Sequence, residues 1–73
     1  MPLTLEEMNQ FRNEQANRLT AVGYSAEAAK KATEHFVSSF QYWVAYGETD
    51  MDWYKNFFII HIDGLVAARK AKH

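Results

Sequence analysis

The chain has 73 residues, which allows one domain, residues 1–73, near the smallest size at which a single core is stable alone. It contains no cysteine, which excludes disulfides and thiolate metal sites. Its net charge of -1 is not typical of proteins that bind nucleic acids or anionic membranes in general. We therefore expect burial of bulky aromatic residues, with or without a second subunit, to stabilise the fold.

The first helix is predicted over residues 5–22. Thr4 and Glu7 have the spacing of a capping box, which places the helix start directly after Thr4. Gly23 is well placed to end the helix in a left-handed conformation. Apolar residues recur at the helical period over an arc of roughly 140°. The stripe that we expect to be buried consists of Leu5, Met8, Phe11, Ala16, Leu19 and Val22.

The second helix is predicted over residues 25–46, with Ser25 as its N-cap and Gly47 just after its end. Its apolar arc covers about 220°, which is wider than one neighbouring helix can cover. The residues expected to face inward are Ala28, Ala32, Phe36, Val37, Phe40, Tyr42, Trp43, Val44 and Tyr46.

The third helix is predicted over residues 50–70, with Thr49 or Asp50 as its cap. It is apolar nearly all round, so more than one side should be covered. Its most hydrophobic window, residues 53–68, is shorter than a membrane span and contains Lys55, His61 and Asp63. We therefore expect a buried helix and not a transmembrane one.

Two short connections make neighbouring helices antiparallel, so the sequence predicts an all-α, up-down-up three-helix bundle. We expect the second and third helices to form a core hairpin across which the first helix packs. Because the first helix is too narrow to cover both, the surplus apolar surface predicts a homodimer. Candidate interface residues are Trp43, Tyr46, Trp53, Phe57, Ile60, His61 and Gly64.

Two of these candidates carry a more specific prediction. Gly64 lies inside a helix, where glycine costs about 1 kcal/mol relative to alanine, so we expect a backbone or ring to pack against it, within the fold or its assembly. His61 lies in the apolar arc, and we interpret it as a hydrogen-bonded histidine of the core or of an interface.

No catalytic, cofactor-binding or metal-binding pattern is found in the sequence. The three histidines are scattered, and Ser38 and Ser39 lack the partners of a nucleophile. The acidic residues Glu48, Asp50 and Asp52 are too few and too close for a calcium loop, so we interpret them as helix-capping acids. We do not expect an enzyme.

The run LTAVGYSAEAA at residues 19–29 resembles the helix-loop-helix of ubiquitin-associated domains. Because the second helix is predicted to continue far beyond the length found in that compact fold, neither the fold nor ubiquitin binding is carried over. The same run is similar to a helix-turn-helix, with residues 25–33 as recognition helix and Arg69, Lys70 and Lys72 for phosphates. The early part of that helix offers no Arg, Asn or Gln to read base edges.

The leading hypothesis is a non-enzymatic protein-protein interaction module, a dimeric adaptor, inhibitor or regulator, that binds another protein through an aromatic helix face. The alternative is a small helix-turn-helix-like DNA-binding regulator, although the charge disfavours nucleic acid. Residues 1–7 are acidic where a signal peptide is basic, and they lack an apolar segment. We therefore expect a cytoplasmic location without membrane association.

Overall fold

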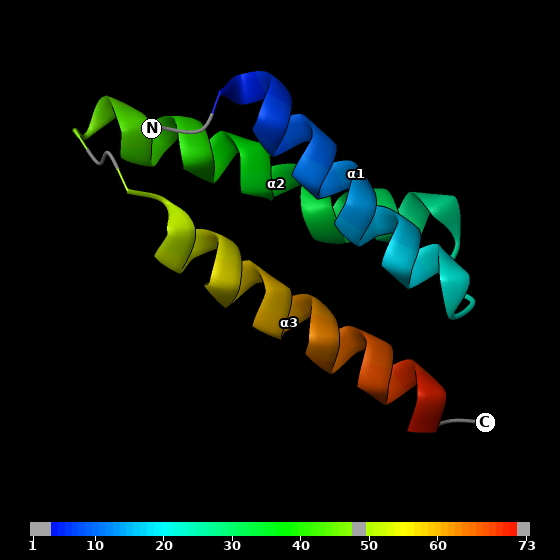
Figure 1. The fold of residues 1–73 in the computed structure, drawn as a ribbon. Coiled ribbons are helices and arrows are strands. Elements are labelled where there is room, and N and C mark those ends of the chain that lie inside the picture. The colour runs from blue at the N-terminus through cyan, green and yellow to red at the C-terminus, as the bar shows by residue number, and fades with distance from the viewer. Residues whose placement is uncertain (1–3, 48–49, 72–73) are drawn as a thin grey trace.

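The computed structural model describes residues 4–47 and 50–71. They form three α-helices, α1 (Leu5–Ala21), α2 (Ala26–Ala45) and α3 (Asp52–Ala71), which run up, down and up (Figure 1). The predicted start of the first helix coincides with the observed one, and the other five boundaries lie one or two residues away. The prediction of an all-α fold of three helices is confirmed.

The helix ends follow from local side-chain chemistry. Thr4 Oγ1 accepts a hydrogen bond from the Glu7 N–H at 3.1 Å, and the Glu7 carboxylate accepts one from the Thr4 N–H at 3.3 Å, which completes the capping box. Ser25 Oγ accepts from the Ala28 N–H at 3.0 Å. Asp50 accepts from the Asp52 N–H at 3.1 Å at the start of α3, whereas Thr49 lies outside the described residues.

Glycines end α1 and α2 as predicted. Gly23 has a φ of 104° and Gly47 a φ of 101°, in the region that side chains with a Cβ rarely adopt. Both residues follow the C-cap of a helix, Val22 for α1 and Tyr46 for α2. The chain therefore reverses direction within a few residues at each point.

The pairing of the helices differs from the prediction. α1 and α2 pack closely against each other, while α3 lies alongside with fewer contacts (Figure 1). The expected core hairpin of the second and third helices, with the first packed across it, is therefore wrong. Small side chains at the α1–α2 contact, among them Ala16 and the fully buried Ala29, allow these two backbones to approach. Large rings separate α3 from the other two helices.

The core centres on Phe36, which is fully buried and touches rings from both other helices. Its ring centroid lies 4.3 Å from that of Phe58, 5.0 Å from Tyr54 and 5.1 Å from Phe11. Full burial of a side chain of this size contributes on the order of 2 to 3 kcal/mol. The buried apolar residues are Met8, Phe11, Leu19, Ala29, Phe36, Phe40, Met51, Phe58 and Ile62.

Two predicted stripes are shifted. On α1 the predicted Leu5 is 45% exposed, and Gln15, which accepts a hydrogen bond from Arg18 at 3.0 Å, is buried instead. On α2 the predicted Ala28 is exposed, and the buried line runs through Ala29 and Thr33. The Thr33 hydroxyl donates to the Ala29 carbonyl at 2.9 Å, so this polar residue is satisfied inside its own helix and can be buried. A helical-wheel prediction that counts threonine as polar therefore places the buried line of α2 on the wrong residues.

Polar contacts fix the C-terminal half of α3 to the α1–α2 turn. The Tyr24 hydroxyl donates to the Leu65 carbonyl at 2.8 Å, and Arg69 Nη2 donates to the Gly23 carbonyl at 3.1 Å. The Arg69 guanidinium also lies 5.3 Å from the centroid of the Tyr24 ring. We call these contacts of Tyr24 and Arg69 the polar clamp. The clamp holds Leu65 and Arg69 toward the bundle on the same side of α3 as the buried Phe58 and Ile62, so the opposite side of the helix faces away.

Candidate functional site

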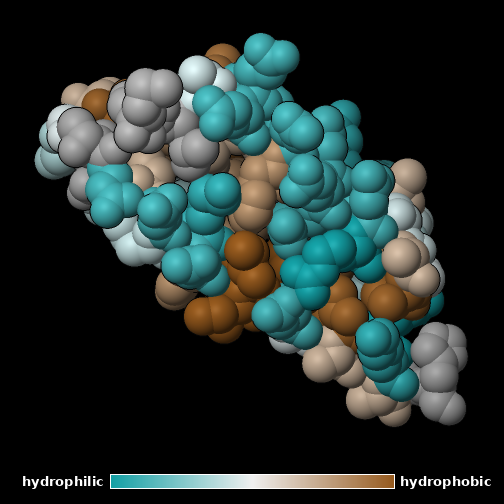
Figure 2. Space-filling model, in the orientation of Figure 1, coloured by the Kyte–Doolittle hydropathy of each residue, from teal (hydrophilic) through white to brown (hydrophobic). Residues whose placement is uncertain are grey.

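Large apolar side chains remain exposed at one end of α2 and along α3. Tyr46 is 74% exposed, and Phe57 and Ile60 are each 69% exposed. Hydrophobic atoms reach the surface over the middle of α3 (Figure 2). Contiguous exposed apolar surface of this kind marks binding sites. The exposed large apolar residues are Leu5, Tyr42, Val44, Tyr46, Trp53, Phe57 and Ile60.

Four of the aromatic residues touch one another where α2 ends and α3 begins. We call Tyr42, Trp43, Tyr46 and Trp53 the aromatic cluster. Ring centroids are 5.3 Å apart for Tyr42 and Tyr46, 5.7 Å for Tyr42 and Trp43, and 5.6 Å for Trp43 and Trp53. Trp43 also packs on the core, so the cluster is anchored from below while its outer rings stay exposed.

The outer side of α3 continues the exposed apolar surface beyond Trp53. Phe58 and Ile62 point into the core, which leaves the opposite side of the helix without cover from α1 or α2. Phe57, Ile60 and Gly64 are exposed there, while the exposed His61 lies on the flank toward α2, with its ring centroid 6.2 Å from that of Phe58. The helix therefore presents large side chains in its first half and small ones further along.

The predicted interface residues divide into two groups. Trp43, Tyr46 and Trp53 belong to the aromatic cluster, whereas Phe57, Ile60 and Gly64 lie on the outer side of α3 with His61 on its flank. The two groups meet at Trp53. Their role at an interface stays a prediction.

Two of the specific expectations change. A Cβ built on Gly64 would meet no atom of the described residues within 4 Å, apart from the adjacent backbone of its own helix, so the expected packing of a backbone or ring on Gly64 within the fold is wrong. Only its packing in an assembly remains as a prediction. His61 is exposed, so its interpretation as a core histidine is also wrong, and the interface interpretation remains. Both errors have one cause, because hydropathy does not show which apolar side of α3 turns inward.

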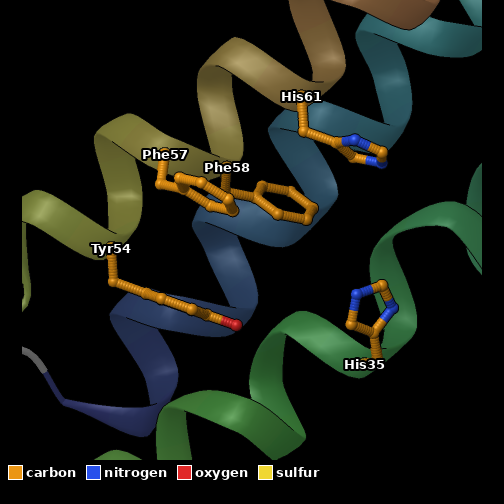
Figure 3. A pocket seen from close by; sticks show the side chains of 5 residues that line it. All are labelled: His35, Tyr54, Phe57, Phe58 and His61. Carbon is orange, nitrogen blue, oxygen red and sulfur yellow. The ribbon is translucent and has the colours of Figure 1, made fainter.

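A shallow pocket of about 290 Å³ lies between α2 and α3 (Figure 3). His35 from α2 and His61 from α3 stand at opposite sides of it, and Tyr54, Phe57 and Phe58 supply the remaining, largely apolar wall. Within residues 4–47 and 50–71, no group of three or more His, Asp or Glu side chains is placed to hold a metal ion. The pocket thus adds concave apolar surface beside Phe57.

Several surface features were not foreseen from the sequence. Tyr42 and Val44 were expected to face inward but are 57% and 46% exposed. The polar clamp joins Tyr24 to Arg69, and because these residues are far apart in the sequence, no local sequence pattern predicts their contact. The exposed state of Tyr42 could have been suspected from the width of the apolar arc of α2.

The helix-turn-helix alternative loses part of its basis. Arg69, assigned there to phosphates, donates to the Gly23 carbonyl and stacks on Tyr24. On the proposed recognition helix, Lys31 Nζ lies 3.5 Å from the Glu27 carboxylate, which offsets its charge. Lys72 lies outside the described residues.

Comparisons with protein-family models, with curated proteins and with solved structures found no match for the chain. Among the described residues, no helix has both the length and the apolar character needed to cross a membrane.

Proposed function

We propose that the protein is a non-enzymatic interaction module, a dimeric adaptor, inhibitor or regulator, which recognises another protein through the aromatic cluster. The observation that carries this proposal is the exposure of several mutually packed rings at one end of the fold, with Tyr46 at 74% and Trp53 at 45%. The outer side of α3 continues this surface.

The chemistry of the aromatic cluster suits protein recognition. Tryptophan and tyrosine are the residues most enriched among those that dominate binding free energies. Each offers a large apolar body with a polar group at its edge, so it binds an apolar pocket without demanding full dehydration of its polar atom. Tyr42, Trp43 and Tyr46 already pack on one another. Binding would therefore restrict few further side-chain rotamers, which keeps the entropic cost of binding low.

The arrangement fits a partner with an apolar groove. Tyr42 and Tyr46 are one helical turn apart on α2, and Trp53 stands beside Trp43 from the next helix. An amphipathic helix inserted into a groove presents residues at this spacing. We therefore expect the partner to supply an apolar groove and not a charged surface.

The test is capture of the partner from the native cell with paired baits, followed by identification by mass. Tyr46→Asp places a charge on the most exposed ring and should abolish capture while leaving the fold intact. Asn9→Asp, an equal change of charge at an exposed position of α1, should capture the partner like the parent. A partner retained equally by both baits would contradict the role of the cluster.

DNA titration separates the proposal from the helix-turn-helix alternative. With Arg69 engaged in the polar clamp, we expect no complex with labelled duplex at low salt. A complex whose affinity falls with salt by a slope of several phosphate contacts would favour the alternative instead.

A further inference from the structure

Six exposed positions of α3 form a regular stripe along the outer side of the helix. Their spacing alternates between four and three residues, which is the seven-residue repeat by which two helices pack. The stripe is about 27 Å long at 1.5 Å per residue. We call it the α3 stripe, and it consists of Trp53, Phe57, Ile60, Gly64, Ala67 and Ala71.

The stripe changes in size along its length. Its first three positions carry large side chains, and its last three carry glycine or alanine. A parallel second copy would place large against large at one end and leave a void at the other. Both overpacking and cavities weaken a contact, so this arrangement is disfavoured.

An antiparallel second copy matches large to small at every position. We infer that two chains pair antiparallel through the α3 stripe, about a two-fold axis that passes beside position 62. Ile60 then faces Gly64 of the other copy, Phe57 faces Ala67, and Trp53 faces Ala71, because the two members of each pair are equally distant from position 62. A two-fold axis repeats each of these pairs, so one stripe satisfies itself.

Gly64 acquires a role in this arrangement. Among residues 4–47 and 50–71, no atom beyond the adjacent backbone of α3 lies within 4 Å of its Cβ position, so the space is open for the Ile60 side chain of the second copy. His61 lies next to the axis and would approach the same residue of the second copy. The stripe thus accounts for the open space at Gly64, and it brings the exposed edge of His61, whose ring lies 6.2 Å from that of Phe58, to the pairing surface.

Charge favours the same direction of pairing. α3 carries Asp52 in its first turn and Lys70 in its last turn. Antiparallel pairing brings the acidic end of one copy beside the basic end of the other, whereas parallel pairing would place like charges together. The inner side of α3, with Phe58 and Ile62, is already buried against α1 and α2, so the bundle does not obstruct the stripe.

This inference rests on the proposed function in one respect, since it assigns the α3 part of the exposed surface to a second copy. Tyr42 and Tyr46 lie on α2, outside the stripe, and stay available for a different protein. The two claims can therefore fail separately.

The first experiment exchanges the two central residues. Sedimentation of the parent over a wide concentration range should give a monomer-dimer equilibrium. Ile60→Gly leaves a void and Gly64→Ile sets two isoleucines against each other, so each should raise the dimer Kd by about tenfold or more. The double variant restores a large-small pair and should return the Kd to near that of the parent. If the two increases in dimer Kd add in the double variant, the antiparallel register is overturned. If the parent is monomeric at every concentration, the dimer itself is overturned.

The second experiment reads the direction of pairing. Because the chain has no cysteine, single cysteines can be placed at will. Asn56→Cys and Lys70→Cys lie on the same exposed edge of the stripe near its opposite ends. When both variants are mixed with a short bismaleimide, antiparallel pairing predicts the mixed product 56–70 in excess, resolved by mass. An excess of 56–56 and 70–70 products would overturn the inference.

Asn9→Cys, at an exposed site on α1, is the matched control and should cross-link weakly with either variant. Capture of a partner through Tyr46 by a chain that stays monomeric would refute the self-pairing while supporting the proposed recognition surface. A chain that dimerises but captures no partner would support the self-pairing and refute the proposed recognition surface.

Discussion

The two sides of α3 are almost equally apolar but have opposite surroundings. The inner side buries Phe58 and Ile62 to 5% and 0% exposure, while the outer side leaves Phe57 and Ile60 at 69%. Adjacent residues of the same type, Phe57 and Phe58, therefore make very different contributions to the folded chain. The comparison shows that hydrophobicity on a helix indicates how much surface must be covered but not by which molecule.

The strongest test of the comparison removes the two neighbouring rings in turn. Phe58 packs on Phe36 at 4.3 Å and on Phe11 at 6.2 Å, so Phe58→Ala should cost about 3 to 5 kcal/mol. A fold of this size has a total stability of about the same amount, so the variant should be largely unfolded.

Phe57→Ala is the matched variant and should cost less than about 1 kcal/mol when measured on the monomer. Urea denaturation followed by circular dichroism at the lowest practical protein concentration gives both values. Equal losses would mean that the outer side of α3 is not free in the single chain.

A second test contrasts two glycines. Gly23 has a φ of 104°, and its Cβ position lies 3.3 Å from Arg69 Nε, so Gly23→Ala should cost about 1 to 2 kcal/mol. Gly64 is helical with open space around its Cβ position, so Gly64→Ala should stabilise the monomer by about 0.5 to 1 kcal/mol.

Thermal unfolding of both variants at low concentration provides the measurement. A loss of stability in Gly64→Ala under those conditions would show that the chain itself packs against this glycine. A gain in Gly23→Ala would argue against the left-handed turn that follows α1.

A third test, with a smaller effect than the loss of Phe58 or Gly23, concerns the polar clamp on the inner side of α3. Tyr24→Phe removes the hydroxyl that donates to the Leu65 carbonyl at 2.8 Å and should cost about 1 kcal/mol. Asn56→Ala, on an exposed position of the same helix, should change stability by less than about 0.5 kcal/mol. If both variants unfold at the same urea concentration as the parent, the clamp does not stabilise the position of α3.

Local chemistry made the helices predictable. The pair Thr4 and Glu7, the cap Ser25, and the glycines at 23 and 47 act within a few residues of themselves, so their effect does not depend on the rest of the fold. The helix boundaries followed from them with small errors. Part of the exposed apolar surface was also predictable. The apolar arcs of the second and third helices are wider than the first helix can cover, and this excess pointed to Tyr46, Phe57 and Ile60.

Pairing and phase depended on contacts between distant residues. Ala29 and Thr33, whose hydroxyl donates to the Ala29 carbonyl, set the buried line of α2. Ala28 and Ala29 have the same side chain, so the sequence alone could not show which of the two is buried. The clamp between Tyr24 and Arg69 joins residues far apart in the sequence, and together with the buried Phe58 and Ile62 it fixes the rotation of α3. Whether Gly64 and His61 turn inward was decided by that rotation and not by their neighbours in the sequence.

The loose seating of α3 has a consequence for how the chain opens. Aromatic rings, the Arg18–Asp63 ion pair and the polar clamp attach α3 to the α1–α2 hairpin, whereas α1 and α2 pack closely against each other. We expect the lowest-energy partial unfolding to be the detachment of α3 as a unit. In native-state hydrogen exchange, the amides of α3 should then exchange with a common free energy below that of the centres of α1 and α2. A chain built in this way loses its third helix before its first two.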